Sequence, residues 1–97
     1  MGFTPLRGQT EAAAAMLAVA AGVPRSAVQR AIALRSAKGV VSLAWQADFT
    51  MRDATALQSL LAQLGPHEML RPGAADRFPL AVEEMRWQID FLTRSAH

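Results

Sequence analysis

Four polar side chains between residues 24 and 38 have the types and the spacing of a surface that binds nucleic acid. They are Arg25, Ser26, Gln29 and Arg30. If the segment is a helix, residues three and four apart share a face, so these four side chains point the same way. Arginine donates paired hydrogen bonds to guanine, and glutamine pairs with adenine. We therefore expect these side chains to contact base edges of duplex DNA.

Two helices that meet at a corner would hold this face outward. Gly22 suits a tight turn, and Pro24 suits the first turn of the helix that follows. Ala18 stands four residues before the glycine, where a larger side chain would hold the helices apart. Val28 and Ala31 point back toward the first helix. The second helix is expected from Pro24 to Lys38, with Gly39 ending it.

The first helix is expected to begin at Thr10, which can act as its N-cap, with Glu11 in the first turn. From residue 12 to residue 21 this segment is apolar throughout. A helix that is apolar all round has every face covered. We expect the second helix to cover one side, and another element or another chain to cover the other.

These residues resemble a known family. The run Ala18-x-x-x-Gly22-Val23-x-x-x-x-Val28-x-Arg30 resembles the helix-turn-helix of bacterial transcription regulators. Lys38-Gly39-Val40-Val41 is similar to the Lys-Gly-Leu-Val that leads into the wing of winged-helix repressors. The resemblance covers about residues 14–52. It departs from the family at the start, because only residues 5–9 precede the first helix, where the repressors usually carry a further full helix.

The rest of the first half is expected to form the wing. The β-branched and aromatic run from Val40 to Trp45, followed by Phe49 to Met51, predicts a short β-hairpin. Beyond it, Asp53 can N-cap a third helix over 53–65, and a loop should follow over 66–79. The predicted fold is a single, mainly α domain over 1–97. It has an arm over 1–9, a helix-turn-helix with a hairpin over 10–52, and a C-terminal helix over 80–95.

The C-terminal helix carries two apolar strips. One strip follows the three-and-four spacing of a coiled-coil seam, and the other adds two aromatic residues. Two strips are more than a small domain needs to cover, so the helix is predicted to be a dimer or partner interface; packing of both strips within the chain is the alternative. The predicted interface residues are Val82, Met85, Trp87, Ile89, Phe91 and Leu92.

The charge is uneven along the chain, although the formal net charge is only +2. Residues 1–52 carry six basic and two acidic side chains, and residues 53–97 carry four basic and six acidic ones. The basic half contains the helix-turn-helix pattern, which suits contact with phosphates. We expect Arg35, Lys38 and Arg52 to make these contacts. We expect the C-terminal helix, with its two apolar strips, to set the spacing of two half-sites in a homodimer.

Residues suited to catalysis or metal binding are sparse. The chain has no cysteine, and His67 has no second histidine near it in the sequence. Glu83 and Glu84 are adjacent, so they point in different directions around a helix. We expect no enzyme activity, metal or cofactor, no membrane span, and a cytoplasmic location.

Two functions therefore remain open. The first is a small DNA-binding transcriptional regulator. The second is a protein-binding inhibitor of the phage or plasmid type, similar in kind to anti-CRISPR proteins. It would act through an apolar and arginine-bearing surface, and the high hydrophobic content of 52% motivates it.

Overall fold

A computed structural model describes residues 5–94, and regular structure there is entirely helical. The helices are α1 (Pro5–Ala21), α2 (Arg25–Ala33), α3 (Ala37–Gln46), α4 (Met51–Ala62) and α5 (Val82–Arg94), with a 3-10 turn, η1 (Ala74–Asp76), before α5. The expected class, a mainly α domain with a β-hairpin, is wrong in its β part, because these described residues contain no strand. The fold is all-helical.

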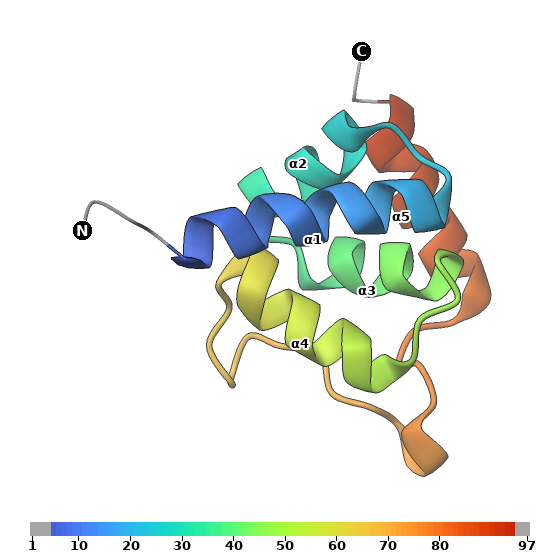
Figure 1. The fold of residues 1–97 in the computed structure, drawn as a ribbon. Coiled ribbons are helices and arrows are strands. Elements are labelled where there is room, and N and C mark those ends of the chain that lie inside the picture. Colours follow the sequence, from blue (N-terminus) through green and yellow to red (C-terminus); the bar gives the residue numbers. More distant parts are fainter. Residues whose placement is uncertain (1–4, 95–97) are drawn as a thin grey trace.

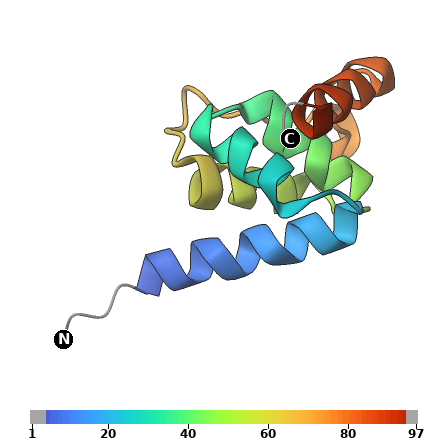
Figure 2. The ribbon, with the colours of Figure 1, turned by 90° about the horizontal axis from the view of Figure 1, so that it is seen from above.

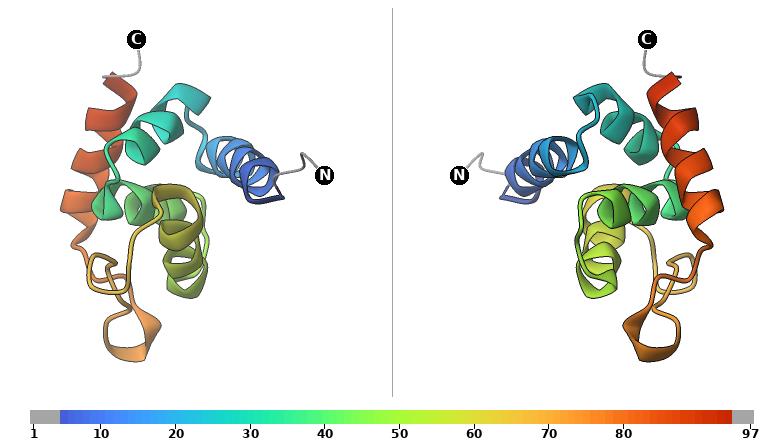
Figure 3. Two further views of the ribbon diagram at one scale, coloured as in Figure 1. Left: turned by 90° about the vertical axis from the view of Figure 1, so that its left-hand side faces the viewer. Right: turned by 90° about the vertical axis from the view of Figure 1, so that its right-hand side faces the viewer.

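Helix α3 lies at the centre of the molecule and packs against each of the other four α-helices (Figure 1). Six consecutive residues, 39 to 44, are buried in it. Figure 3 shows α1 and α5 on opposite sides, with α2 and α3 between them. Burial all round a helix requires apolar or small side chains on every face, and residues 39–44 supply them.

The predicted hairpin over residues 40–51 is instead most of α3 and the start of α4. Ser36 begins α3 as its N-cap, with its hydroxyl accepting a hydrogen bond from the Gly39 N–H at 2.9 Å. Val40, Val41 and Leu43 are buried against the surrounding helices. Tertiary packing and the cap therefore outweigh the β preference of the two valines, which is a weak and context-dependent signal.

The helices α1, α2 and α3 all end in the same kind of turn. Gly22, Arg35 and Asp48 each adopt the left-handed conformation, with φ of 70°, 49° and 65°, and they stand 13 residues apart. In each turn the left-handed residue and the next one donate N–H groups back to the helix that has ended, for example Val23 to Ala18 O at 3.0 Å. This pattern is the Schellman motif. It splits the expected helix over 24–38 into α2 and α3.

Helix α4 begins two residues earlier than predicted. Thr50 is the N-cap, and its side chain and that of Asp53 form a capping box by accepting each other's backbone N–H groups. Asp53 is therefore the third helical residue rather than the cap. The helix ends at Ala62, where Gln63 adopts a left-handed conformation, so the predicted end at residue 65 is also too late.

The segment between α4 and α5 is tied to the core by one buried side chain. Gln58 of α4 is fully buried, and its amide bonds both backbone groups of Leu70. Its Nε2 donates to Leu70 O at 2.9 Å, and its Oε1 accepts from the Leu70 N–H at 2.7 Å. These two bonds hold the middle of the connecting segment against α4.

Helix α1 forms an outer layer of the molecule, and its N-terminal end extends past the other helices (Figure 2). It starts at Pro5 rather than at Thr10, so the predicted irregular arm over 1–9 is wrong for residues 5–9, and residues 1–4 lie outside the described range. The end of α1 is tied to the end of α3, because Gln46 Nε2 donates to Ala21 O at 2.8 Å.

Candidate nucleic-acid interface

The corner between α1 and α2 is built from the residues that carry the helix-turn-helix resemblance. Gly22 takes the left-handed position, where a side chain would be strained. Ala18 lies 5% exposed beneath the turn and accepts the hydrogen bond from Val23. Pro24 is the N-cap of α2, and its φ of −62° is the value its ring imposes. The corner is thus explained by the backbone preferences of Gly22 and Pro24 and by the small, buried side chain of Ala18.

Helix α2 divides into a buried and an exposed side. Val28 and Ala31 are almost completely buried, as the sequence predicts, and Ala27 is buried as well. Arg25, Ser26 and Gln29 are exposed. Two hydrogen-bonding side chains thus lie on the first turn of the helix, with a third one turn later, on the side facing away from the core.

Arg30 does not share this exposed surface. It is half-buried, and its Cζ lies 5.5 Å from the centre of the Phe91 ring on α5, in a cation–π contact. Its Nε is buried and has no hydrogen-bond partner. Because the Arg30 side chain packs against Phe91 of α5, its position does not support the predicted contact with a base edge.

Arg35 supports the fold. Its Nε donates to Ala62 O at 3.3 Å and an Nη to Gln63 O at 3.1 Å, so it bonds carbonyl groups at the C-terminal end of α4. The same Nη lies 3.7 Å from Glu68 Oε1. A cation beside a helix C-terminus is favourable because carbonyl oxygens there carry partial negative charge. The phosphate contact predicted for Arg35 competes with these bonds.

The other two predicted phosphate contacts lie on different parts of the molecule. Lys38 is exposed in the first turn of α3, directly after α2 and its connecting turn. Arg52 is exposed in the first turn of α4, and that turn lies below α3 in Figure 1, away from α2. Lys38 therefore follows the C-terminal end of α2, whereas Arg25 and Ser26 lie at its N-terminal end, and Arg52 lies on a different helix.

Positive charge around α2 is not offset by carboxylates in the same stretch of sequence. Between Glu11 and Asp48 the chain has four basic residues and no acidic one. All four follow the corner. A surface made from this stretch has no fixed negative charge of its own to repel phosphate.

The predicted interface on α5 separates into two sets. Met85, Ile89 and Leu92 are buried in the core of this chain, so the seam-like strip does not form a free surface. Trp87 is 56% exposed and Val82 46% exposed. Phe91 is half-buried and stacks on Trp87, with ring centres 5.5 Å apart and planes 7° apart. The available part of α5 is therefore its aromatic strip together with Val82.

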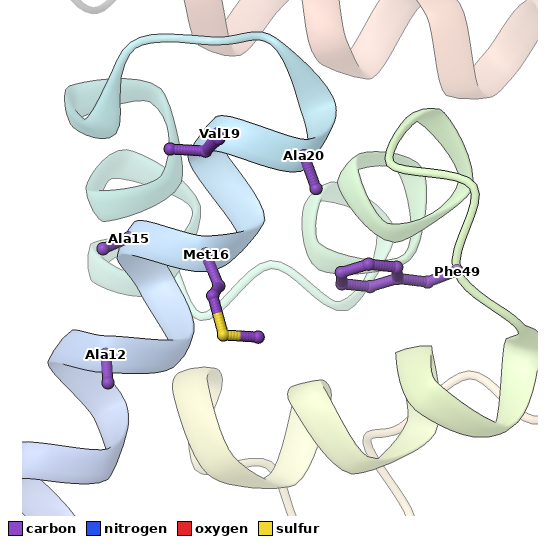
Figure 4. A pocket seen from close by; sticks show the side chains of 6 residues that line it. All are labelled: Ala12, Ala15, Met16, Val19, Ala20 and Phe49. Carbon is purple, nitrogen blue, oxygen red and sulfur yellow. The ribbon is translucent and has the colours of Figure 1, made fainter.

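The sequence pattern missed an exposed apolar face on α1. Met16 and Val19 are the most exposed large apolar side chains among the described residues, and Phe49 lies across a groove from them (Figure 4). The uniform apolar character of residues 12–21 was the available signal. The sequence pattern predicts that another element or another chain covers the second side of this helix; within the described residues, Met16 and Val19 on that side stay exposed.

The described part of the chain contains no cluster of three or more histidine, cysteine, aspartate or glutamate side chains that could hold a metal ion. Across residues 5–94, no helix combines the length and the apolar character needed to cross a membrane. The molecule is a small all-helical protein with an exposed polar face on the second helix of a corner. Comparison with protein-family models, curated proteins and solved structures finds no match to this chain.

Proposed function

We propose that this protein binds duplex DNA and acts as a small transcriptional regulator, with α2 as its recognition helix. The observation that carries the proposal is the exposed set Arg25, Ser26 and Gln29 on a short helix held by the corner with α1. In helix-turn-helix proteins the second helix enters the major groove and its N-terminal residues contact base edges. Arg25 and Ser26 lie in that N-terminal part, and Gln29 lies one turn further along the helix.

Lys38 completes the proposed surface as a phosphate contact, since it follows α2 closely and is exposed. Arg30 has a different part in the proposal from the one expected from sequence: packed on Phe91, it adds positive potential near the helix without reading a base. A regulator of bacterial transcription would work in the cytoplasm.

The test is binding of purified protein to a labelled random-sequence duplex over a salt series, followed by selection of a preferred site. On that site, Arg25→Ala and Gln29→Ala should each weaken binding about 5- to 150-fold, the range for one lost base contact. Lys38→Ala should weaken binding to all sequences. It should also reduce, by about 1, the slope of the logarithm of the binding constant against the logarithm of the salt concentration.

The matched control is Arg71→Ala, which removes an exposed arginine from the segment between α4 and α5. It should leave site preference unchanged and alter affinity little. The proposal is wrong if the wild-type protein does not bind duplex DNA at low salt. It is also wrong if Arg25→Ala and Gln29→Ala bind as well as Arg71→Ala does.

A second candidate function is binding to another protein, and the aromatic strip of α5 favours it. An exposed tryptophan stacked on phenylalanine, with an arginine also in contact with that phenylalanine ring, has the composition of an interaction hot spot. Under this alternative, a defined partner would bind wild-type protein and lose affinity at least about tenfold for Trp87→Ala, whereas Gln29→Ala would bind normally.

A further inference from the structure

The outer face of α1 is apolar and has no partner within the described chain. Val19 is 83% exposed and Met16 65% exposed. Ala12 and Ala20 are exposed on the same helix. From residue 12 to residue 21 the helix carries no charged or polar side chain. A contiguous apolar surface of this kind on a small protein marks an interaction site.

This face borders a groove of about 500 Å³ between α1 and the α3–α4 turn, lined by Ala12, Ala15, Met16, Val19, Ala20 and Phe49 (Figure 4). A second hollow of about 340 Å³ adjoins it, shares Met16 and Phe49, and reaches Asp53, Ala56 and Leu57 on α4. Together they form a trough beside α1. One wall of the trough is α1, the other is formed by Phe49 and α4, and both walls are predominantly apolar.

The spacing along α1 indicates what fills this trough. Gly8, Ala12, Ala15 and Val19 recur at intervals of four, three and four residues, the spacing of a seam where two helices pack. We propose that the occupant is a second copy of this chain, with the two α1 helices antiparallel across a two-fold axis near residues 15 and 16. The axis then places Val19 opposite Ala12 of the second copy, and Met16 opposite Ala15.

Shape and charge both suit this pairing. Each large side chain meets a small one, so the projecting Val19 of one copy enters the space beside Ala12 of the other. The alanines allow the helix axes to approach closely. The α1 residues nearest the axis carry no charge that would have to be removed from water, and Asp53 lies at the α4 edge of the trough. A contact related by a two-fold axis must be self-complementary, and the alternation of large and small residues meets that condition.

The area that a stable dimer buries can be compared with the surface of this chain. A stable interface buries about 800 Å² on each partner, which is about one-eighth of the 6051 Å² that this chain exposes. Helix α1, 17 residues long, spans about 25 Å. The pairing buries its outer face together with the edge of α4 that carries Ala56 and the rim formed by Phe49.

The arrangement also affects α2. The axis of an antiparallel helix pair is perpendicular to both helices, and α1 runs across the view in Figure 1 with α2 above it. Figure 3 shows α1 as the outermost helix on the side away from α5. A vertical axis in front of α1 leaves both α2 helices on the upper side of the dimer. Only this last consequence rests on the proposed function, since dimerisation does not require DNA.

The first test measures mass in solution by sedimentation over a range of protein concentrations, without DNA. Wild-type protein should dimerise, and Val19→Glu should raise the dissociation constant at least about 100-fold because it buries a carboxylate in an apolar contact. Val19 is exposed in the monomer, so this variant should keep its helical circular dichroism. The matched control is Val82→Glu, the same substitution at an exposed position of α5, which should remain dimeric.

Other outcomes contradict the proposal. A wild-type chain that stays monomeric at about 100 μM overturns it and leaves the trough for a different protein. A dimer that Val82→Glu dissociates and Val19→Glu does not would place the interface on α5. Loss of DNA binding in either case concerns the proposed function alone, because the mass is measured without DNA.

The second test fixes the direction of the helices, and the absence of native cysteine makes it simple. Ala15→Cys places two thiols beside the axis, and they should form a disulfide-linked dimer on mild oxidation. In the antiparallel pair, Gly8→Cys thiols stand about 22 Å apart along the helix and should not link. A Cβ at Gly8 meets no atom within 4 Å, so this control should fold normally. Equal linking at both positions would refute the antiparallel pairing.

Discussion

Replacement of Gln58 by leucine tests how the segment between α4 and α5 is held. Gln58 is fully buried, and its amide satisfies both the N–H and the carbonyl group of Leu70, at 2.7 and 2.9 Å. Leucine has a similar size and suits the buried side of α4. The substitution therefore removes two hydrogen bonds while it changes packing little.

The expected loss of stability follows from the two groups left behind. An unpaired buried donor or acceptor costs about 1–3 kcal/mol. Leu70 is half-buried, so water can partly replace one of the lost bonds. Leucine also regains some apolar burial. We expect Gln58→Leu to lower the free energy of unfolding by about 2–4 kcal/mol, a large part of the 5–15 kcal/mol typical of a small domain.

Urea denaturation followed by circular dichroism measures this loss, and thermal unfolding should show a fall of roughly 8–30 °C in the midpoint. The control is Gln29→Leu, which replaces an exposed glutamine on α2 and should change the free energy of unfolding by less than about 0.5 kcal/mol. If Gln58→Leu were as stable as this control, the two bonds would contribute nothing net and the reasoning would be refuted.

Two further predictions concern helix geometry. Asp48→Gly should raise the free energy of unfolding by about 0.5–1 kcal/mol, because Asp48 has a φ of 65° that glycine adopts without strain. Gly22→Ala, at a φ of 70°, should lower the free energy of unfolding by about 1 kcal/mol. Urea denaturation of both variants measures the two changes. Gly39→Ala should destabilise the protein despite alanine's better helix propensity, because a Cβ there would lie 3.0 Å from Ser36 Oγ and 3.3 Å from Leu92 Cδ1. A more stable Gly39→Ala variant in the same urea melts would show that α3 and α5 can separate without cost.

Local signals predicted the corner between α1 and α2 correctly. Gly22 and Pro24 have strong backbone preferences, and the structure places them at the turn and the cap. The ends of α2 and α3 were missed because Arg35 and Asp48 take left-handed positions that glycine usually fills. Ser36, a residue type favoured at N-caps, was the available sign of a new helix, but the β-branched residues after it favoured a strand.

In the candidate site, too, some features followed from local spacing and others depend on residues far away in the sequence. Arg25, Ser26 and Gln29 were expected to share an outward face because helical spacing alone sets their direction, and the three are exposed. The surroundings of Arg30 depend on Phe91, 61 residues later in the chain, and those of Arg35 on the end of α4. The burial of Met85, Ile89 and Leu92 likewise depends on packing partners elsewhere in the chain. Spacing within one helix cannot predict such contacts.

The turns at Gly22, Arg35 and Asp48 are equally spaced, so the number of residues between turns determines the fold as well as the residue types do. Each residue of an α-helix advances by about 100°, so the number of residues between two turns sets the direction in which the chain leaves the second one. One residue added within α2 or α3 would keep the composition and the caps, yet it would rotate every following element against those before it. The register of these two short helices is therefore as much a part of the fold as the residues that fill its core.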